Sequence, residues 1–154
     1  MRRAIVIALL ALAAAPAAAQ ARDASLWATV NVCDTAKQPD AIGIRASMPG
    51  TPKGAKLFMR FRVQYRDGDN WQDVDGADSG WRAVGTAKGV PVEYGWSFTF
   101  QPSADPVTMR GVVKFRWRRG DTLPKQSELA TEAGHRSSAG ADPSDYSAAT
   151  CELG

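Results

Sequence analysis

The strict alternation of apolar and other side chains between Leu57 and Arg66 is the feature that most constrains the fold. Every second residue from Leu57 is apolar, and the residues between them are mainly arginine. Such alternation is typical of a β-strand with one face in a core and the other face in water. Shorter segments with the same period occur along the rest of the chain, and helical periodicity is almost absent. We therefore predict an all-β protein.

The other strand candidates are separated by turn residues. In the first of them, Ala28, Val30 and Val32 are expected to share one face. Seven or eight short strands with turns between them predict a two-sheet antiparallel β-sandwich, and no internal repeat or linker divides it. The candidate segments besides 57–66 are 27–33, 42–46, 71–75, 94–100, 112–118 and 146–153, with 81–84 as a short edge candidate and 129–133 as a weaker one.

The N-terminal region has the three parts of a secretory signal peptide in order. Two arginines are followed by an apolar run over residues 4–15 and by small residues that offer cleavage after Ala19 or Ala21. The run is shorter than the roughly 20 residues that span a bilayer. We predict a signal peptide over residues 1–21 and one exported domain over residues 22–154, periplasmic or extracellular and without a membrane span.

The charge balance changes once the signal peptide is removed. The chain has 19 Lys and Arg residues against 16 Asp and Glu residues, and losing Arg2 and Arg3 leaves 17 basic residues against those 16. A net charge near +1 gives no reason to expect a nucleic-acid partner.

The two cysteines, Cys33 and Cys151, are expected to form a disulfide. The predicted export places the chain in an oxidising compartment, where an even number of cysteines indicates bonding. The alternative is a pair of catalytic or metal-binding thiols. Because there is no CxxC spacing and His135 is the only histidine, we favour the disulfide and expect no metal and no cofactor.

The segment from Val63 to Val74, with the sequence VQYRDGDNWQDV, resembles the third and fourth strands of a fibronectin type III domain. Such domains carry a VQYR segment, a turn and a W-x-x-V segment. Residues 97–100 and 112–118 are similar to the fifth and sixth strands of that family. The resemblance implies a fibronectin- or immunoglobulin-like sandwich of an exported bacterial protein, in which the third and sixth strands are neighbours in one sheet.

Basic side chains share the outward positions of these two strands. If the strands are neighbours, their side chains merge into one basic surface suited to an anionic glycan, another anionic polymer or an acidic protein. The alternative is an ordinary solvated face whose charges prevent aggregation. The residues of this possible anionic-ligand face are Arg60, Arg62 and Arg66 on one strand and Lys114, Arg116 and Arg118 on the other, where Arg110 shares the outward positions.

Pairing across the 63–74 hairpin favours the solvated-face alternative. Opposite charges on paired strands cancel part of each other's field, and a tryptophan opposite an arginine makes a cation–π contact. The pairs expected from a turn at residues 68–69 are Arg62 with Asp75, Gln64 with Asp73 and Arg66 with Trp71.

Three further patterns have both a functional and an ordinary interpretation. His135 lies in one Gly- and Ser-rich loop with Ser137, Ser138 and Asp142, but no Gly-x-Ser-x-Gly elbow accompanies it, which disfavours a hydrolase. Five aspartates suggest a loose calcium site but lack the spacing of a calcium loop, and turn solubility explains them equally well. These aspartates are Asp67, Asp69, Asp73, Asp75 and Asp78.

The tryptophans suggest a sugar-stacking platform only if several are exposed together. Alternation places Trp96 and Trp117 on inward faces, so we expect them in the core. That leaves Trp27, Trp71 and Trp81 as candidates for such a platform.

These observations favour a non-catalytic exported binding or adhesion module whose ligand the sequence does not identify. The alternative is a structural accessory domain of the cell envelope with no specific ligand. A hydrolase is the third and least favoured interpretation.

Overall fold

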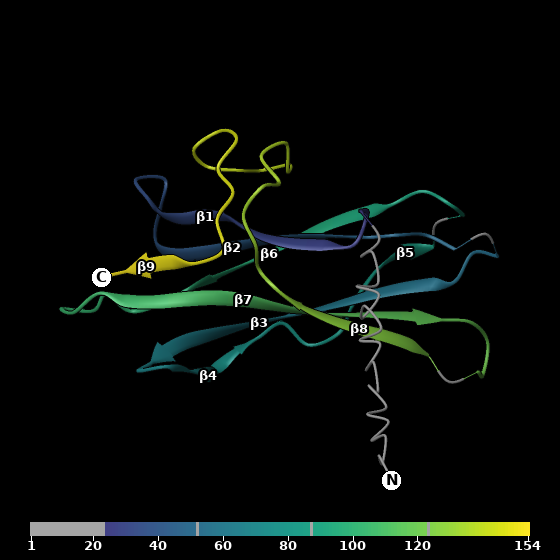
Figure 1. Ribbon diagram of the computed structural model, residues 1–154, viewed down its shortest axis with the longest axis horizontal. Helices are drawn as coiled ribbons and strands as arrows, with labels where there is room; N and C mark the ends of the chain where they lie inside the picture. Colours follow the sequence, from purple (N-terminus) through teal and green to yellow (C-terminus); the bar gives the residue numbers. More distant parts are fainter. Residues whose placement is uncertain (1–23, 52, 87, 123) are drawn as a thin grey trace, which may run out of the picture.

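The computed structural model describes residues 24–51, 53–86, 88–122 and 124–154, so the predicted signal peptide over residues 1–21 lies outside the described residues. In this part of the chain nine strands and no helix form two antiparallel sheets that pack together (Figure 1). The predicted all-β antiparallel sandwich is confirmed. The same residues contain no helix with the length and hydropathy that a membrane crossing requires.

One sheet has three strands in the order β1-β2-β6, and the other has six, with the central order β4-β3-β7-β8. In the second sheet β5 also pairs with β3, and β9 pairs with β7. The strands of the first sheet are β1 (Trp27–Thr35), β2 (Gln38–Met48) and β6 (Val92–Thr99). The strands of the second are β3 (Lys56–Asp67), β4 (Asn70–Asp78), β5 (Arg82–Thr86), β7 (Val107–Arg118), β8 (Lys125–Ala130) and β9 (Cys151–Leu153).

The core lies between the two sheets and follows the predicted alternation of β3 and β7. Phe61 of β3 and Phe115 of β7 are completely buried, as is Ile42 of the opposite sheet. Trp117 is buried as predicted, whereas Trp96 is only partly buried against the core. The apolar parity of β3 therefore predicts its inner face correctly.

β1 departs from the predicted alternation halfway along the strand. Val30 pairs with Ile44 of β2, but Val32 pairs with Gly43, the adjacent residue, so β1 has one extra residue at this point. Such a β-bulge reverses the side-chain parity beyond it. The expectation that Val32 shares a face with Val30 was therefore wrong, and the same reversal turns Cys33 inward.

Cys33 and Cys151 form the predicted disulfide. Their Sγ atoms are 2.06 Å apart and their Cα atoms 5.4 Å apart. Cys33 lies on β1 and Cys151 on β9, so the bond joins the three-stranded sheet to the six-stranded sheet. The last predicted strand, 146–153, is correct only over its final three residues, since β9 begins at Cys151.

The segment between β8 and β9 folds back over β1. Val30 and Ala148 exchange backbone hydrogen bonds of 2.9 and 3.0 Å. Thr29 Oγ1 lies 2.7 Å from Ser147 Oγ, and a second bridge joins Val32 to Asp142. The free edge of β1 is thus covered by residues of the same chain (Figure 1).

The predicted register of the β3–β4 hairpin is correct next to the turn and wrong farther from it. The ladder follows the prediction as far as Asp73, but Arg62 then pairs with Asp78 and not with Asp75. The intervening residues of β4 form an irregularity that contains Gly76, with a φ of 77°. That backbone conformation favours glycine, so the hairpin register changes here.

Candidate functional site

β3 and β7 are direct neighbours, as the predicted basic face requires. They pair antiparallel over ten residues of each strand, with Phe58 opposite Arg116 and Arg60 opposite Lys114. Paired residues of an antiparallel ladder lie on the same side of the sheet. The basic residues of the two strands therefore share the outer face of the six-stranded sheet.

Arg60 is neutralised by a carboxylate on this face. Its Nε lies 2.8 Å from Asp78 Oδ1 and 3.0 Å from Oδ2, and its Nη2 also donates to Asp78. This hydrogen bonding lowers the pKa of the Asp78 carboxyl and raises the pKa of Arg60. Asp78 also accepts a 2.8 Å hydrogen bond from the Gly80 backbone N–H, which fixes the carboxylate in place.

Arg62 and Lys114 share acidic partners at the middle of the face. Arg62 Nη1 lies 2.7 Å from Asp73 Oδ2, and its Nη2 lies 3.2 Å from Glu128 Oε2. Lys114 Nζ is also 3.2 Å from the same Glu128 oxygen. Two cations and two carboxylates therefore balance one another across β4, β3, β7 and β8.

Two further arginines of the face make cation–π contacts with tryptophans. The Arg110 guanidinium carbon lies 4.3 Å from the centroid of the Trp71 ring, and that of Arg116 lies 3.8 Å from the Trp81 ring. The predicted cation–π contact of Trp71 with Arg66 is therefore wrong in its partner. The two residues do pair in the ladder, but Arg66 Nε donates to the Gly68 carbonyl, 3.0 Å away.

Burial lowers the pKa of Arg110, which lies between Trp71 and Gln64. Its Nε and Nη2 lie 2.9 and 2.8 Å from Gln64 Oε1. Gln64 in turn donates to Asp73, with a 2.9 Å distance between Nε2 and Oδ1. The Gln64 side-chain amide thus connects Arg110 to Asp73 and to the ion pairs of Arg62, toward the end of the face near the β3–β4 turn.

Asp78→Asn is expected to destabilise the protein at neutral pH, by an amount that shrinks as the pH falls. Because Arg60 lowers the folded-state pKa of Asp78, the carboxylate stabilises the fold above its unfolded pKa of about 4 and loses this contribution as the pH falls through the folded value. The pair lies at the surface, which limits the effect to about 1 kcal/mol. Urea unfolding of both proteins at a series of pH values measures it. A difference that does not change with pH would contradict the assignment.

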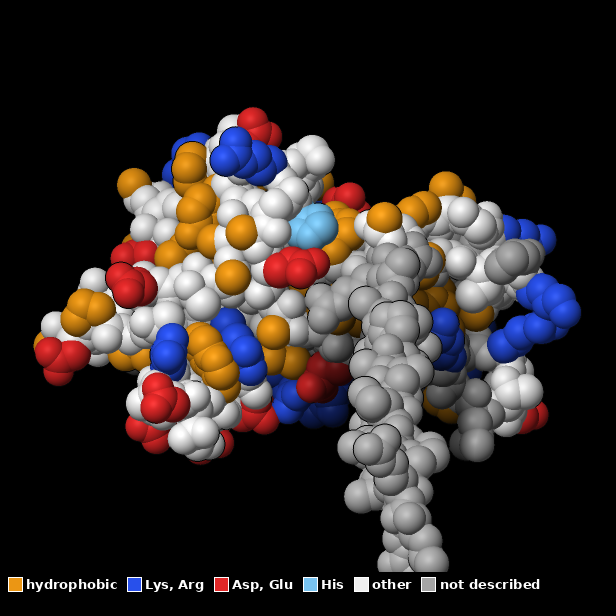
Figure 2. All heavy atoms as spheres, in the orientation of Figure 1, with side chains coloured by type: hydrophobic (Ala, Val, Ile, Leu, Met, Phe, Trp, Pro, Cys, Tyr) orange, Lys and Arg blue, Asp and Glu red, His pale blue; other side chains and the backbone are white. Residues whose placement is uncertain are grey.

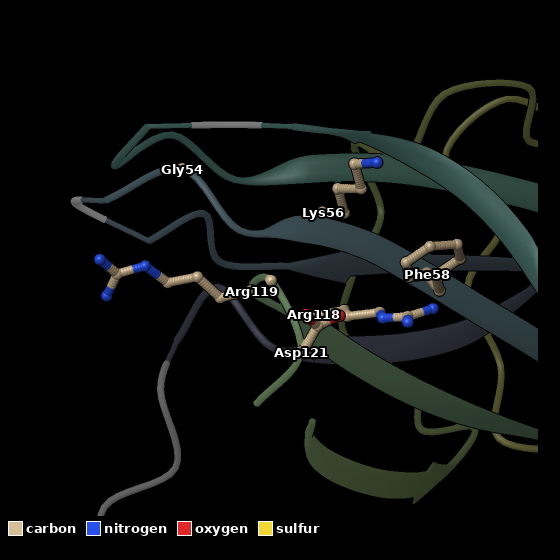
Figure 3. A pocket seen from close by; sticks show the side chains of 7 residues that line it. Gly54, Lys56, Phe58, Arg118, Arg119 and Asp121 are labelled. Carbon is tan, nitrogen blue, oxygen red and sulfur yellow. The ribbon is translucent and has the colours of Figure 1, made fainter. Parts of the chain in front are cut away.

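The opposite end of the same face is arranged differently. A hollow of about 440 Å³ lies there, between the start of β3 and the turn after β7 (Figure 3). Lys56, Phe58 and Arg118 line it from the strands, and Arg119 and Asp121 line it from the turn. Figure 3 shows Lys56 and Arg118 on the two sides of the strand that carries Phe58, while Arg119 extends away from them.

The basic side chains at this hollow have no carboxylate partner. Within the described parts of the chain, Lys56, Arg118 and Arg119 form no ion pair and no side-chain hydrogen bond. The side chain of Lys88 also passes close to Gly54, which lines the hollow. The position that a Cβ atom would take on Gly54 lies 3.3 Å from Lys88 Cγ. In Figure 2 acidic and basic side chains mix over the left of the molecule, whereas basic ones predominate at its right-hand end.

The sequence identified Arg118 as part of this group but missed Lys56 and Arg119. Lys56 has the outward parity of β3 and directly precedes the segment recognised as a strand. Its outward parity would have been enough to place Lys56 on the predicted basic face. Arg119 lies beyond the end of β7, where alternation stops and no longer predicts the direction of a side chain.

The histidine loop does not assemble a hydrolase-like group in the structure. The His135 ring stacks on Trp27, with centroids 4.4 Å apart, and its Nε2 lies 3.4 Å from Glu132 Oε1. Asp142 accepts a 2.7 Å hydrogen bond from Thr35 Oγ1. In the described segments no hydrogen bond joins the His135 ring to a serine or to Asp142.

The aspartates and tryptophans of the remaining two patterns are dispersed. Among the residues that the structure describes, no three His, Cys, Asp or Glu side chains are placed to hold a metal ion. Trp71 and Trp81 each stack on an arginine of the outer face, while Trp27 contacts His135 on the β1 side. The three tryptophans therefore do not form one platform.

Comparison with known proteins assigns no family to the chain. No protein-family model matches it, and no curated protein matches it. The candidate site is therefore defined by its own geometry, and its centre is the hollow at the Lys56 end of the outer face.

Proposed function

We propose that the protein is an exported, non-catalytic binding module that takes an anionic group of its ligand into the hollow lined by Lys56, Phe58 and Arg118. The observation that carries the proposal is the contrast within one face. Arg60, Arg62 and Lys114 are each paired with carboxylates, while the cations at the hollow have no carboxylate partner among the residues that the structure describes. Cations around a concave surface attract and orient an anion when they are not already held in ion pairs, as here among the described residues, although Asp121 also lines the hollow.

The lining of the hollow indicates the chemistry of the ligand. Lys56 supplies an ammonium group, and Arg118 supplies a planar guanidinium that can donate two parallel hydrogen bonds. Both suit carboxylate, sulfate or phosphate oxygens. Phe58, half-buried between them, offers an apolar surface to a sugar ring or a similar flat group. A second hollow of about 490 Å³, lined by Ala83 and Thr86, adjoins Lys56 and Phe58 on the β5 side. This shape suits an acidic glycan or another anionic polymer better than a small ion.

Export is the part of the proposal that rests on the N-terminal sequence and on the disulfide. The apolar run before residue 16 and the small residues after it have the order of a signal peptide. A disulfide between Cys33 and Cys151 suits the periplasm or the extracellular space, where such bonds persist. The adjacency of β3 and β7 also supports a fibronectin- or immunoglobulin-like arrangement.

A structural accessory domain of the envelope is the second candidate. The ion-pair network around Glu128 favours it, because balanced surface charges keep a sheet soluble without binding anything. The two candidates differ in one respect that can be measured. Only a binding module should hold a polyanion through a few identified residues.

The Lys56→Gln, Arg118→Gln double variant is expected to bind heparin about tenfold more weakly than wild type at low salt, because the two strand-borne cations of the hollow are lost. The matched control is Arg66→Gln, Arg136→Gln, which removes two exposed cations that do not line the hollow. Affinity measured by calorimetry or surface plasmon resonance should fall steeply with added salt in wild type. Equal losses in the two doubles would attribute binding to net charge alone. No binding by wild type would contradict the proposal and favour the accessory domain.

A further inference from the structure

β6 forms an edge of the three-stranded sheet and, in the described residues, pairs on one side only, with β2. Its eight residues follow β2 without a register shift. Two hydrogen bonds just beyond its ends fix which residues face β2. Gly50 donates to the Val90 carbonyl at 3.0 Å, and Phe100 donates to the Asp40 carbonyl at 2.9 Å.

The outward backbone groups of β6 follow from those two bonds. Both bonds continue the β2–β6 register, and both join even-numbered residues. Hydrogen-bonded pairs recur at every second residue of an antiparallel ladder, so the even-numbered residues of β6 direct their N–H and C=O groups to β2. Glu93, Gly95, Ser97 and Thr99 therefore direct theirs away from the sheet. Within the described chain these outward groups have no backbone partner.

The other sheet edges are protected in ways that β6 is not. β1 is covered by the 142–148 segment, and β4 and β5 carry irregularities in their pairing with β3. The edge strand β8 pairs regularly with β7, but it has only six residues and carries Lys125 and Glu128, and short length and charge also discourage edge pairing. Covering and bulging are two usual means by which a protein prevents its edges from pairing with another chain. On β6 the only charged residue is Glu93, which lies 3.5 Å from Arg45 of its own sheet.

Apolar side chains along β6 are incompletely covered. Tyr94, Trp96 and Phe98 face the core but are only partly buried, and Val90 just before the strand is 62% exposed. The guanidinium of Arg82 lies 4.1 Å from the Trp96 ring and covers one face of it. A regular, unpaired edge with a row of half-exposed aromatic side chains has the properties of a strand-addition site.

We propose that β6 is a self-association edge that pairs antiparallel with β6 of a second copy of this chain. The strand is self-complementary in one register, with Trp96 of the two copies on the two-fold axis. In that register Glu93 lies opposite Thr99, and Gly95 lies opposite Ser97. All four outward residues are then used, giving about eight backbone hydrogen bonds, two from each hydrogen-bonded pair.

The side chains agree with this register. On the outer face the small residues Gly95 and Ser97 oppose each other, and Glu93 meets an uncharged threonine, so no like charges are opposed. On the inner face Tyr94 lies opposite Phe98, a favourable aromatic pair. Such a two-fold contact closes on itself and stops at a dimer. The proposal concerns the other sheet and does not depend on the anion-binding function.

Ser97→Pro tests the proposal, because it removes an outward N–H that none of the described strands uses, and an edge strand tolerates proline. Sedimentation velocity over a concentration series should show a reversible wild-type dimer, and its dissociation constant should rise at least about tenfold in the variant. The control is Gln126→Pro on β8. Its N–H also points outward, since Thr131 N donates to Gly111 O in the same β7–β8 register. The control should dimerise like wild type.

Ser97→Glu provides a second test that avoids proline. The new carboxylate would lie near Glu93 of the second copy and should also weaken the dimer at least about tenfold. Circular dichroism and melting would confirm that each variant is folded. A wild-type protein that stays monomeric at every concentration would overturn the proposal, even if it bound an added apolar peptide at β6. Equal weakening by Gln126→Pro would also overturn it, because the contact would then not be specific to β6.

Discussion

Replacing both cysteines, Cys33→Ala and Cys151→Ala, is expected to lower the free energy of unfolding by about 5 kcal/mol. The bond closes a loop across a sequence separation of 118 residues. A cross-link of that span lowers the conformational entropy of the unfolded chain and so makes unfolding less favourable. Alanine is chosen because Cys151 is buried and a serine hydroxyl there would add a desolvation cost. Guanidinium unfolding of the oxidised wild type and of the variant measures the difference.

The reduced wild type is the control for the disulfide prediction. If the effect comes from the cross-link, wild type with reduced cysteines should unfold at nearly the same denaturant concentration as the double variant. A loss below about 1 kcal/mol in the variant would contradict the prediction, since it would mean that the unfolded chain is already compact without the bond.

Phe61→Ala is expected to cost about 3–5 kcal/mol, the usual loss for a buried phenylalanine. Phe61 is completely buried on β3, and its ring centroid lies 6.1 Å from that of Tyr94 on the opposite sheet. Truncation therefore removes contacts between the two sheets and leaves a cavity that the paired strands cannot close. Chemical denaturation of the purified variant gives the change in stability.

The matched control for Phe61 is Asp75→Ala, at an exposed position of β4. Its expected cost is under about 0.5 kcal/mol. Losses of similar size in the two variants would show that the side chains of β3 do not alternate between core and solvent as described, because a one-residue slip exchanges the two faces.

Alternation predicted the strands well wherever one face is buried and no residue is inserted. On β3 and β7 the parity from Leu57 and from Val113 is correct over the whole predicted segment. It failed on β1, where a bulge before Val32 reverses the faces. It also failed beyond Asp73 on β4, where Gly76 takes a positive φ. A bulge adds one residue to a strand and changes neither its composition nor the two-residue alternation on either side of it. Local sequence patterns therefore do not show where the bulge lies.

The candidate site was only partly predictable. Parity placed Arg60 and Lys114 on one face, and the resemblance to a fibronectin type III domain implied that their strands are neighbours, which the structure confirms. The partner of Arg60 was not predictable, because Asp78 reaches it only through the irregular part of β4. That Lys56 has no carboxylate partner in the described chain was not predictable from the sequence either. It depends on where every carboxylate of the sheet lies, which is a property of the folded chain.

The most direct test of the proposed anion-binding site is a two-dimensional NMR titration with a sulfated oligosaccharide, following the backbone amides. We predict that the largest shifts occur at Lys56 and Phe58 and in the turn from Arg118 to Asp121, the residues that line the hollow. The amides of Arg62 and Lys114, whose side chains already have carboxylate partners, should change little. Shifts centred on Arg62 and Lys114, or spread evenly over all exposed cations, would contradict the account.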